Sequence, residues 1–418
     1  MHRRSSVARS LMMAAVVCVG ACVGSPTDPS QTQSAALTSL PRQLSPAEQG
    51  VLGAANRFSF ALWKTVNTNQ IDSNVFMSPL SASFSLGMAL NGAENQTLDE
   101  MRSALQVGNE SVPDIDAGYK SLIALLTSLD PQVTMSIANS IWYRKTYSFD
   151  QTFLDNDASY FNATIKPLDF TNQQASLASI NGWVNDQTHG KIPSILDEID
   201  PDNVMFLINA IYFKGSWRDR FDPAQTQNAP FHAVSGDESA QLMHRNAKMS
   251  YTETAMYQAV DLPYGDSAFT MTVVLPKAGT SVESLAASFD ATSWQAVAGS
   301  LREADVDLYL PKLTMTWKQS LIPDLQSLGM HVPFDPNAAD FTGMSTTGPR
   351  LYISSVQHKT FVTIDEEGTE AAAVTSTGIS TASAEVPVTM RVDHPFIFVI
   401  RERLSGTVLF MGKVVRIN

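Results

Sequence analysis

A near-continuous apolar segment at residues 203–213 (NVMFLINAIYF) constrains the fold more than any other feature of the chain. Its β-branched and aromatic residues favour a strand, and the lack of polar alternation indicates burial on both faces. Such a strand needs a sheet around it and a layer on each side. Strand patterns also occupy 268–275 (AFTMTVVL) and 306–310, and most of 352–417. We therefore predict a large sheet with central strands.

Helical patterns alternate with these strands. Pro46–Trp63 is preceded by Ser45, a good N-cap, and Glu48 follows three residues later, as in a capping box. Ser81–Leu90 is a second helix candidate, apolar on most sides. No repeat and no long linker interrupts residues 46–418, so we predict one domain of the α+β class.

Composition excludes several functional classes. The formal net charge of −13 argues against a nucleic-acid surface, which needs clustered basic residues. Both cysteines, Cys18 and Cys22, lie near the N-terminus, so the body has no disulfide, thiol nucleophile or cysteine–metal site.

Catalytic motifs are also missing. The sequence contains no G-x-S-x-G or H-E-x-x-H motif, and its seven histidines have no ligand spacing. We expect neither an enzyme nor a metal or cofactor site. A triad is recognised by geometry and not by sequence order, so an enzyme stays open as an alternative.

The N-terminus has the pattern of an export signal. Three arginines in Met1–Ser10 precede the apolar stretch Leu11–Gly20, which is too short to span a bilayer. Residues 19–22 (VGAC) resemble a bacterial lipobox, so we predict a lipoprotein signal peptide at residues 1–21. Cys22 would be lipidated, and residues 22–45, polar and rich in small residues, would form a flexible tether to the membrane.

The predicted location is therefore a membrane-anchored lipoprotein at the cell envelope or cell surface. The alternative is an ordinary secretory signal cut near Ala21, which would make the protein secreted.

Several motifs, in order and spacing from residue 74 to residue 413, together resemble the serpin family. They are Asn74–Ser81 (NVFMSPLS), Gly92-Ala93 with Thr97, Ile137–Trp142 (IANSIW), Ile180–Val184 with Thr188–Ile192, Asn209–Trp217 (NAIYFKGSW), Asp393–Phe396 and Leu409–Lys413. One departure is Asn95, which stands where the family commonly has glycine. The resemblance implies an α+β serpin fold with three β-sheets, about nine helices and an exposed reactive-centre loop. The resemblance covers residues 46–418 and implies a reactive-centre loop at about residues 366–390 and a monomer. Each motif alone has modest specificity.

The resemblance implies a serine protease inhibitor that acts as a suicide substrate, by loop insertion and covalent acyl-enzyme trapping. Residues 366–385 would be the loop, and after Glu370 no charge occurs for fourteen residues. Composition alone would favour a solvated linker. A strand that enters a packed sheet needs small or β-branched, uncharged residues on its buried face. Counting by two, that face is Thr369, Ala371, Ala373, Thr375, Thr377 and Ile379.

The resemblance assigns hinge and insertion roles along this segment. Gly368 would supply backbone freedom, and Glu370 falls on the opposite face. The hinge and insertion residues are Glu366, Gly368, Thr369, Glu370, Ala371, Ala372, Ala373, Val374, Thr375 and Thr377.

The reactive bond implied by counting from Gly368 is Ala382–Ser383, with Thr381 and Ala384 as alternates. All are small, which fits the shallow primary pocket of elastase-like or some subtilisin-like proteases and disfavours a trypsin-like target. Two alternatives remain: an inhibitor of papain-like cysteine proteases, and a non-inhibitory serpin that acts as a binding or carrier module.

Two supporting clusters follow from the same resemblance. Ser78, Ser81, Asn209 and His358 would form a hydrogen-bonded shutter where the sheet opens; the simpler interpretation is a satisfied buried polar cluster. Trp217, Lys312 and Glu366 would form the breach, at the position where the loop leaves the sheet. Core packing is the simpler interpretation of Trp217.

Overall fold

The computed structural model describes residues 34–200, 203–347, 350–369 and 386–417. All helices and strands discussed below lie in one compact unit, Ala36–Asn418. The predictions for the signal peptide, for Cys22 and for residues 370–385 fall outside the described residues.

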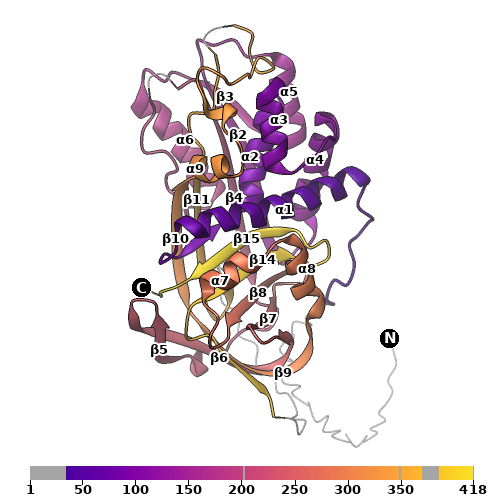
Figure 1. Ribbon diagram of the computed structural model, residues 1–418, viewed down its shortest axis with the longest axis vertical. Helices are drawn as coiled ribbons and strands as arrows, with labels where there is room; N and C mark the ends of the chain where they lie inside the picture. The colour runs from indigo at the N-terminus through magenta and orange to yellow at the C-terminus, as the bar shows by residue number, and fades with distance from the viewer. Residues whose placement is uncertain (1–33, 201–202, 348–349, 370–385, 418) are drawn as a thin grey trace, which may run out of the picture. The chain divides into compact units, whose positions relative to one another are not determined.

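The site is built on a six-stranded sheet (Figure 1). Its strands, in spatial order, are β10 (Leu313–Ser320), β11 (Gln357–Ile364), β12 (Gly368–Thr369), β4 (Met205–Ser216), β2 (Val133–Arg144) and β3 (Thr164–Leu168). β4 is antiparallel to β2 over nearly its whole length, from Val133–Gly215 to Tyr143–Met205. The apolar run at 203–213 therefore is the predicted interior strand.

Both faces of β4 are covered, which explains its lack of polar alternation. On one face Phe206 and Ile208 pack in a small core with Ile180 and Val184 of α6 (Gln173–Gln187). On the other face Phe213 packs in the main core of the molecule, with its ring edge against Phe269.

The remaining strands form a nine-stranded sheet. They are β1 (Val75–Met77), β5 (Gln227–Ala233), β6 (Gly236–Glu253), β7 (Tyr257–Pro263), β8 (Phe269–Pro276), β9 (Arg302–Pro311), β13 (Val388–Arg391), β14 (Phe396–Glu402) and β15 (Val408–Val414). One part consists of β5, β6, β9 and β13, and the other runs from β7 to β1. They join only where the end of β6 pairs with β7, so hydrogen bonding links two of the three expected sheets into one.

Nine α-helices lie in the described part of the chain. They are α1 (Pro46–Asn69), α2 (Pro79–Leu90), α3 (Asn95–Leu105), α4 (Val112–Ser128), α5 (Gln151–Phe161), α6 (Gln173–Gln187), α7 (Val282–Ser288), α8 (Ala291–Ser300) and α9 (Ile322–Ser327), with short 3-10 turns at Pro223–Gln225 and Val332–Phe334. In Figure 1, α1 to α5 gather beside the six-stranded sheet. None of the described helices is long and apolar enough to cross a membrane.

The predicted start of α1 is confirmed in detail. Ser45 Oγ accepts the Glu48 amide at 3.2 Å, and the Ser45 amide donates to the Glu48 carboxylate at 2.7 Å. This capping box satisfies two amides that a helix start leaves unpaired. α2 begins with a simpler cap, in which Ser78 Oγ accepts the Ser81 amide, and its Ser81 side chain hydrogen-bonds Asn209 of β4.

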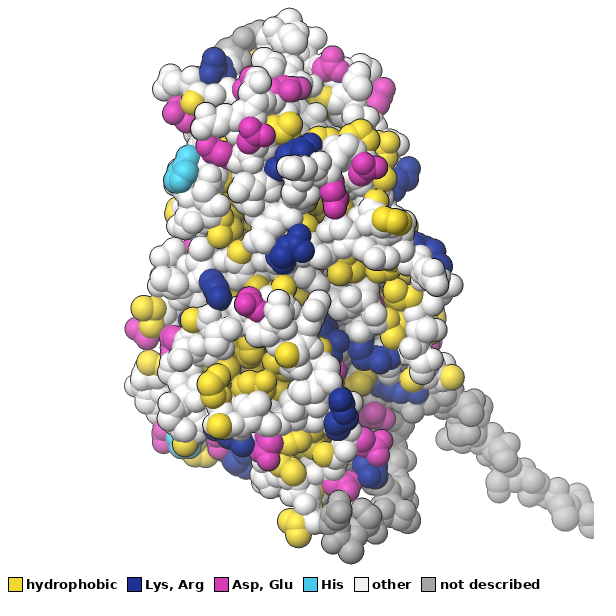
Figure 2. All heavy atoms as spheres, turned by 45° about the vertical axis from the view of Figure 1, so that its right-hand side comes forward, with side chains coloured by type: hydrophobic (Ala, Val, Ile, Leu, Met, Phe, Trp, Pro, Cys, Tyr) yellow, Lys and Arg dark blue, Asp and Glu magenta, His cyan; other side chains and the backbone are white. Residues whose placement is uncertain are grey.

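Charged side chains are spread over the surface. On the face in Figure 2, acidic and basic side chains are interspersed with neutral ones and with small apolar patches. Among the described residues, no group of three histidines, cysteines or acids lies close enough together to hold a metal ion.

Candidate functional site

The candidate site is the space between β4 and β11, which we call the β4–β11 gap. At one end β12 fills it: Thr369 pairs with Ile364 of β11, and Gly368 and Thr369 pair with Ser216 and Gly215 of β4. Below β12, no described strand pairs with β4 on this side or with β11 on the facing side. Two strand edges with unpaired amides and carbonyls therefore face one space, a ready template for another strand.

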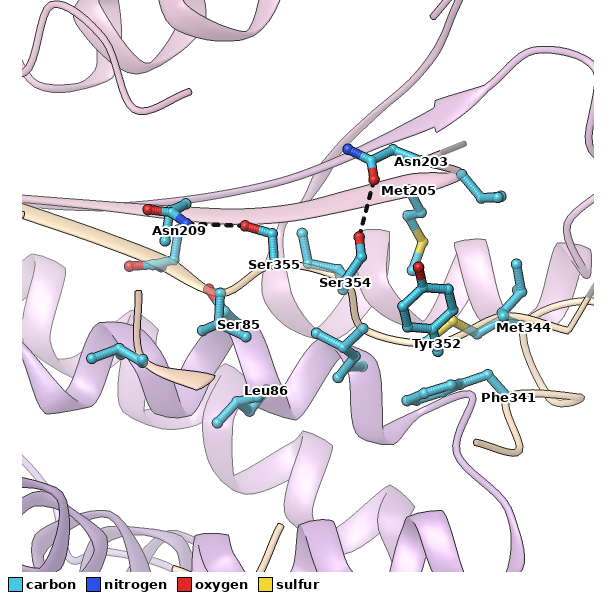
Figure 3. A pocket seen from close by; sticks show the side chains of 18 of the residues that line it. Ser85, Leu86, Asn203, Met205, Asn209, Phe341, Met344, Tyr352, Ser354 and Ser355 are labelled. Carbon is cyan, nitrogen blue, oxygen red and sulfur yellow. Dashed lines mark hydrogen bonds between the residues drawn. The ribbon is translucent and has the colours of Figure 1, made fainter. Parts of the chain in front are cut away.

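Hollows in the packing lie at both ends of this gap. A small cavity of about 20 Å³ just below β12 is lined by Ile211, Phe361 and Thr369. A cavity of about 400 Å³ lies at the far end, between β4, α2 and the start of β11 (Figure 3). The gap is thus incompletely filled where native interiors are close-packed.

Gly368 allows the chain to enter the gap. Its φ of +153° is rare for residues with a side chain, and an added Cβ would lie 2.1 Å from the Gly215 carbonyl oxygen. Only glycine lets the two backbones approach this closely. The predicted hinge residue is therefore required by geometry at this position.

Replacement of Gly368 by valine is expected to detach β12 from β4. The clash and the disfavoured φ together should cost roughly 1–3 kcal/mol locally. Hydrogen–deuterium exchange of the peptide that contains Gly215 and Trp217 should accelerate. Gly279→Val is the matched control, because Gly279 has φ +89° but no atom near its missing Cβ. Unchanged exchange at Gly215 in Gly368→Val would contradict this role.

Thr369 is already buried inside the sheet. Its side chain, 4% exposed, shares a 2.6 Å hydrogen bond with the Tyr264 hydroxyl, and Tyr264 stacks on Trp217 with ring centroids 4.5 Å apart. The Thr369 side chain therefore points into the core.

The three breach residues lie together around the segment that leads into β12. Lys312 Nζ is 2.8 Å from the Glu366 carboxylate, and Trp217 Nε1 donates to the Asp365 carbonyl at 2.8 Å. Burial raises the pKa of Glu366, but hydrogen bonds from Lys312 and Thr226 outweigh it and leave the pKa below its usual value. Trp217 packs in the core and also hydrogen-bonds the backbone that leads into β12; its role in the breach stays a prediction.

The four shutter residues lie together where β4 and the start of β11 face α2, at the edge of the large cavity. The Ser78 amide donates to His358 Nε2 at 2.9 Å, and Ser78 Oγ donates to the Leu409 carbonyl at 2.8 Å. Ser81 Oγ donates to Asn209 Oδ1. The cluster is buried and hydrogen-bonded, and its members come from α2, β4 and β11, the elements that border the gap; a role in sheet opening stays a prediction.

His358 is held in its neutral form. Complete burial lowers the pKa of its imidazole to about 4, and its Nε2 serves as an acceptor, a role that the protonated ring cannot fill. The shutter therefore has a defined protonation state near neutral pH.

The sequence analysis missed Asn139. Asn209 Nδ2 donates to Asn139 Oδ1 at 2.6 Å, and Asn139 Nδ2 donates to the Phe161 carbonyl at 2.7 Å, so the polar network extends to α5. The available signal was the polar pair Asn139-Ser140 inside the otherwise apolar Ile137–Trp142 segment. Tyr264 was also missed, and nothing in its local sequence links it to Thr369.

The other predicted loop residues cannot be placed in the same way. Glu370, Ala371, Ala372, Ala373, Val374, Thr375, Thr377, Thr381, Ala382, Ser383 and Ala384 lie outside the described residues. Their roles remain predictions.

Comparison with known proteins identifies the family. Residues 53–417 match the family described as serpin (serine protease inhibitor). Leukocyte elastase inhibitor A of Mus musculus is 33% identical over 381 residues, which cover 87% of this chain and 98% of that protein. The chain therefore belongs to the serpin family, and the predicted family is confirmed.

Solved structures confirm the fold. The native state of tengpin, a thermophilic serpin, has a TM-score of 0.80 at 30% identity and covers 92% of this chain and 97% of its own. Thyroxine-binding globulin in complex with thyroxine has a TM-score of 0.80 at 27% identity, with 88% and 99% covered. The fold is thus shared by a serpin that binds a small ligand.

Proposed function

We propose that this chain inhibits serine proteases by inserting its cleaved reactive-centre loop into the β4–β11 gap. The observation that carries the proposal is the register of β12. Continuing its pairs with β4 along the chain brings Thr375 opposite Asn209, and continuing its pair with β11 brings Thr375 opposite His358. The two registers thus agree, because each brings Thr375 opposite a shutter residue.

The side chains of such a strand suit the two faces of the gap. Directly opposed residues of antiparallel strands point to the same face. Asn209 reaches Ser81 on the core side, so Thr375 and the alternate residues before and after it would point to the core. These residues are small or β-branched and uncharged, so their burial costs little free energy.

Glu370 is the one charged residue between Thr369 and Glu385. By the same register it would pair with Lys214 of β4, on the face away from the core. A cross-strand pair of opposite charges is mildly stabilising, whereas a carboxylate on the other face would be buried without a partner. The position of this charge therefore supports insertion.

The chemistry belongs to the target protease. Its serine Oγ attacks the Ala382 carbonyl carbon, the bond to the Ser383 nitrogen breaks, and the nitrogen takes the proton relayed by the protease's own base. The resulting ester ties the protease to the loop. Insertion then carries it away and distorts its active site before water hydrolyses the ester, and this chain supplies no catalytic residue.

The target class follows from the small residues around the reactive bond. Elastase-like or subtilisin-like proteases accept such residues, and the related leukocyte elastase inhibitor A carries such a target in its name. Thyroxine-binding globulin supports the second candidate, a carrier, through its shared fold. The uncharged face of the loop favours the inhibitor, because a carrier has no need to bury it.

The inhibitor is tested by mixing the purified chain with elastase-, subtilisin- and papain-like proteases and running a denaturing gel. A covalent complex with a serine protease is the expected result, and sequencing of the released peptide locates the bond. If only the papain-like enzyme forms a complex, the targets are cysteine proteases and not serine proteases. Cleavage without any complex would leave the carrier as the better function.

We also propose that Cys22 anchors the chain to a membrane as a lipoprotein. Residues 19–22 and the arginines before them support this location. Cys22→Ser is expected to move the protein from the membrane pellet to the soluble fraction of its host. If the wild type is itself soluble, the protein is secreted instead, and if the variant stays in the pellet, Cys22 is not the anchor.

A further inference from the structure

The large cavity in Figure 3 is a candidate ligand site that is separate from the reactive loop. It measures about 400 Å³, within the range of small-molecule sites. β4 forms one wall with Met205 and Asn209, and α2 forms the opposite wall with Ser85 and Leu86.

The end of the cavity away from the shutter is closed by irregular segments. Ser354 Oγ donates to Asn203 Oδ1 at 3.2 Å and joins the segment before β11 to the start of β4. Phe341 and Met344 lie beyond Tyr352 in the same view. The cavity is therefore bounded by structure on several sides.

Polar groups lie at the two ends of the cavity. The wall between them combines apolar side chains, such as Leu86 and Met205, with the hydroxyls of Ser85, Ser354 and Ser355. The shutter residues Ser81, Asn209 and His358 mark one end, and Arg144 with Asn203 marks the other. A site of this kind suits an elongated molecule with an apolar body.

Among the described residues, the charged side chains that line the cavity are all basic. They are Arg144, Arg350 and Lys359, although the chain as a whole has 41 acidic and 28 basic residues. Each of the three donates to a backbone carbonyl: those of Asn203, Asn337 and Ser194, respectively. Within the described residues none of them forms an ion pair. Asp340 acts on Arg350, and Asp197 acts on Lys359, only through longer-range electrostatic attraction, so a ligand anion can bind these side chains directly.

We propose that this cavity binds a small amphipathic anion, namely a carboxylate with an unbranched or compact apolar body of about ten carbons. The apolar body lies along α2 and β4, and the carboxylate lies at the Arg144–Arg350 end, where charge-assisted hydrogen bonds stabilise it. Burial of the ligand's apolar body supplies the affinity, and the arginines supply the preference for an anion.

Binding is tested by isothermal titration calorimetry of the intact chain with decanoate below its micelle concentration. One saturable site is expected, with decanamide weaker by about tenfold and decylammonium weaker still. Weak non-saturating heats, or equal affinity for all three probes, would overturn the site.

Arg350→Gln locates the anion. Arg350 is exposed, so the variant should fold, and decanoate affinity should fall by about three- to tenfold while decanamide affinity stays unchanged. Arg302→Gln is the matched control, because Arg302 is also exposed and also donates to backbone carbonyls. Equal affinity of both variants for decanoate would place the ligand elsewhere.

Ser85→Leu fills the cavity from α2. It should abolish binding of both decanoate and decanamide, because the apolar body loses its space. The variant must show the wild-type circular dichroism spectrum and unfolding midpoint, and retained binding of either probe would then contradict the assignment. If Ser85→Leu does not fold like the wild type, Ala89→Val repeats the test with a smaller change.

A second consequence rests on the proposed function. Leu207 and Asn209 form both the cavity wall and the edge of the β4–β11 gap, so a bound anion and an inserted strand exclude each other. Decanoate should therefore lower the yield of covalent protease complex in wild type but not in Ser85→Leu. Because calorimetry needs no protease, failure of the inhibitor proposal leaves the binding result standing, and failure of binding leaves the inhibitor proposal standing.

Discussion

Replacement of Thr375 by arginine is expected to convert the chain from an inhibitor of its protease into a substrate. In an inserted strand, residue 375 lies between Asn209 and His358 and points to the core. A charge left there without a partner costs about 3–5 kcal/mol. Since each 1.4 kcal/mol slows a step about tenfold, hydrolysis of the acyl-enzyme should outrun insertion.

The measurement is the number of inhibitor molecules consumed for each protease molecule inactivated. Thr375→Arg should raise this number at least about tenfold, with cleaved chain as the product. Thr375→Val is the matched control, because valine keeps the branched shape and adds no charge. If Thr375→Arg traps protease as efficiently as Thr375→Val does, residue 375 does not enter the gap.

Acidification is expected to destabilise the native state through His358. Its folded pKa is about 4, below the ordinary value of about 6.5 for an unfolded chain. Between these two pH values the unfolded chain binds a proton that the native state does not, so stability falls as pH decreases through this window. The contribution is complete above about pH 6.5 and amounts to about 2 kcal/mol lost at pH 5.

His358→Gln isolates this contribution, because glutamine does not titrate and offers an oxygen to the Ser78 amide. The urea midpoint of wild type should fall more between pH 7 and pH 5 than that of the variant. His331→Gln, at an exposed position, is the control and should keep the wild-type difference. Parallel pH dependence of wild type and His358→Gln would show that the imidazole titrates normally.

Much of the fold was readable from local sequence. The apolar run at 203–213 predicted β4 because a strand covered on both faces has no polar side to display. Ser45, Pro46 and Glu48 predicted the start of α1 because capping is a contact between near neighbours. The boundaries were less accurate: β4 continues to Ser216, and α1 continues to Asn69.

The site was less readable, because it is made by segments far apart in the chain. β4 and β11 are separated by about 150 residues, and their pairing with the same short strand, β12, is visible only in the structure. The Tyr264–Thr369 hydrogen bond and the place of Asn139 in the shutter network depend on the same long-range packing. The large cavity leaves no sequence pattern, since its lining comes from short pieces of many elements.

The central claim, that the loop becomes a strand between β4 and β11, is tested most directly by the thermal stability of the cleaved chain. Insertion would pair two open strand edges along most of their length and fill the hollows between them. The account predicts that chain cut between residues 377 and 385 unfolds at a temperature at least about 10 °C above that of intact chain. An equal or lower unfolding temperature after the same cut would contradict it.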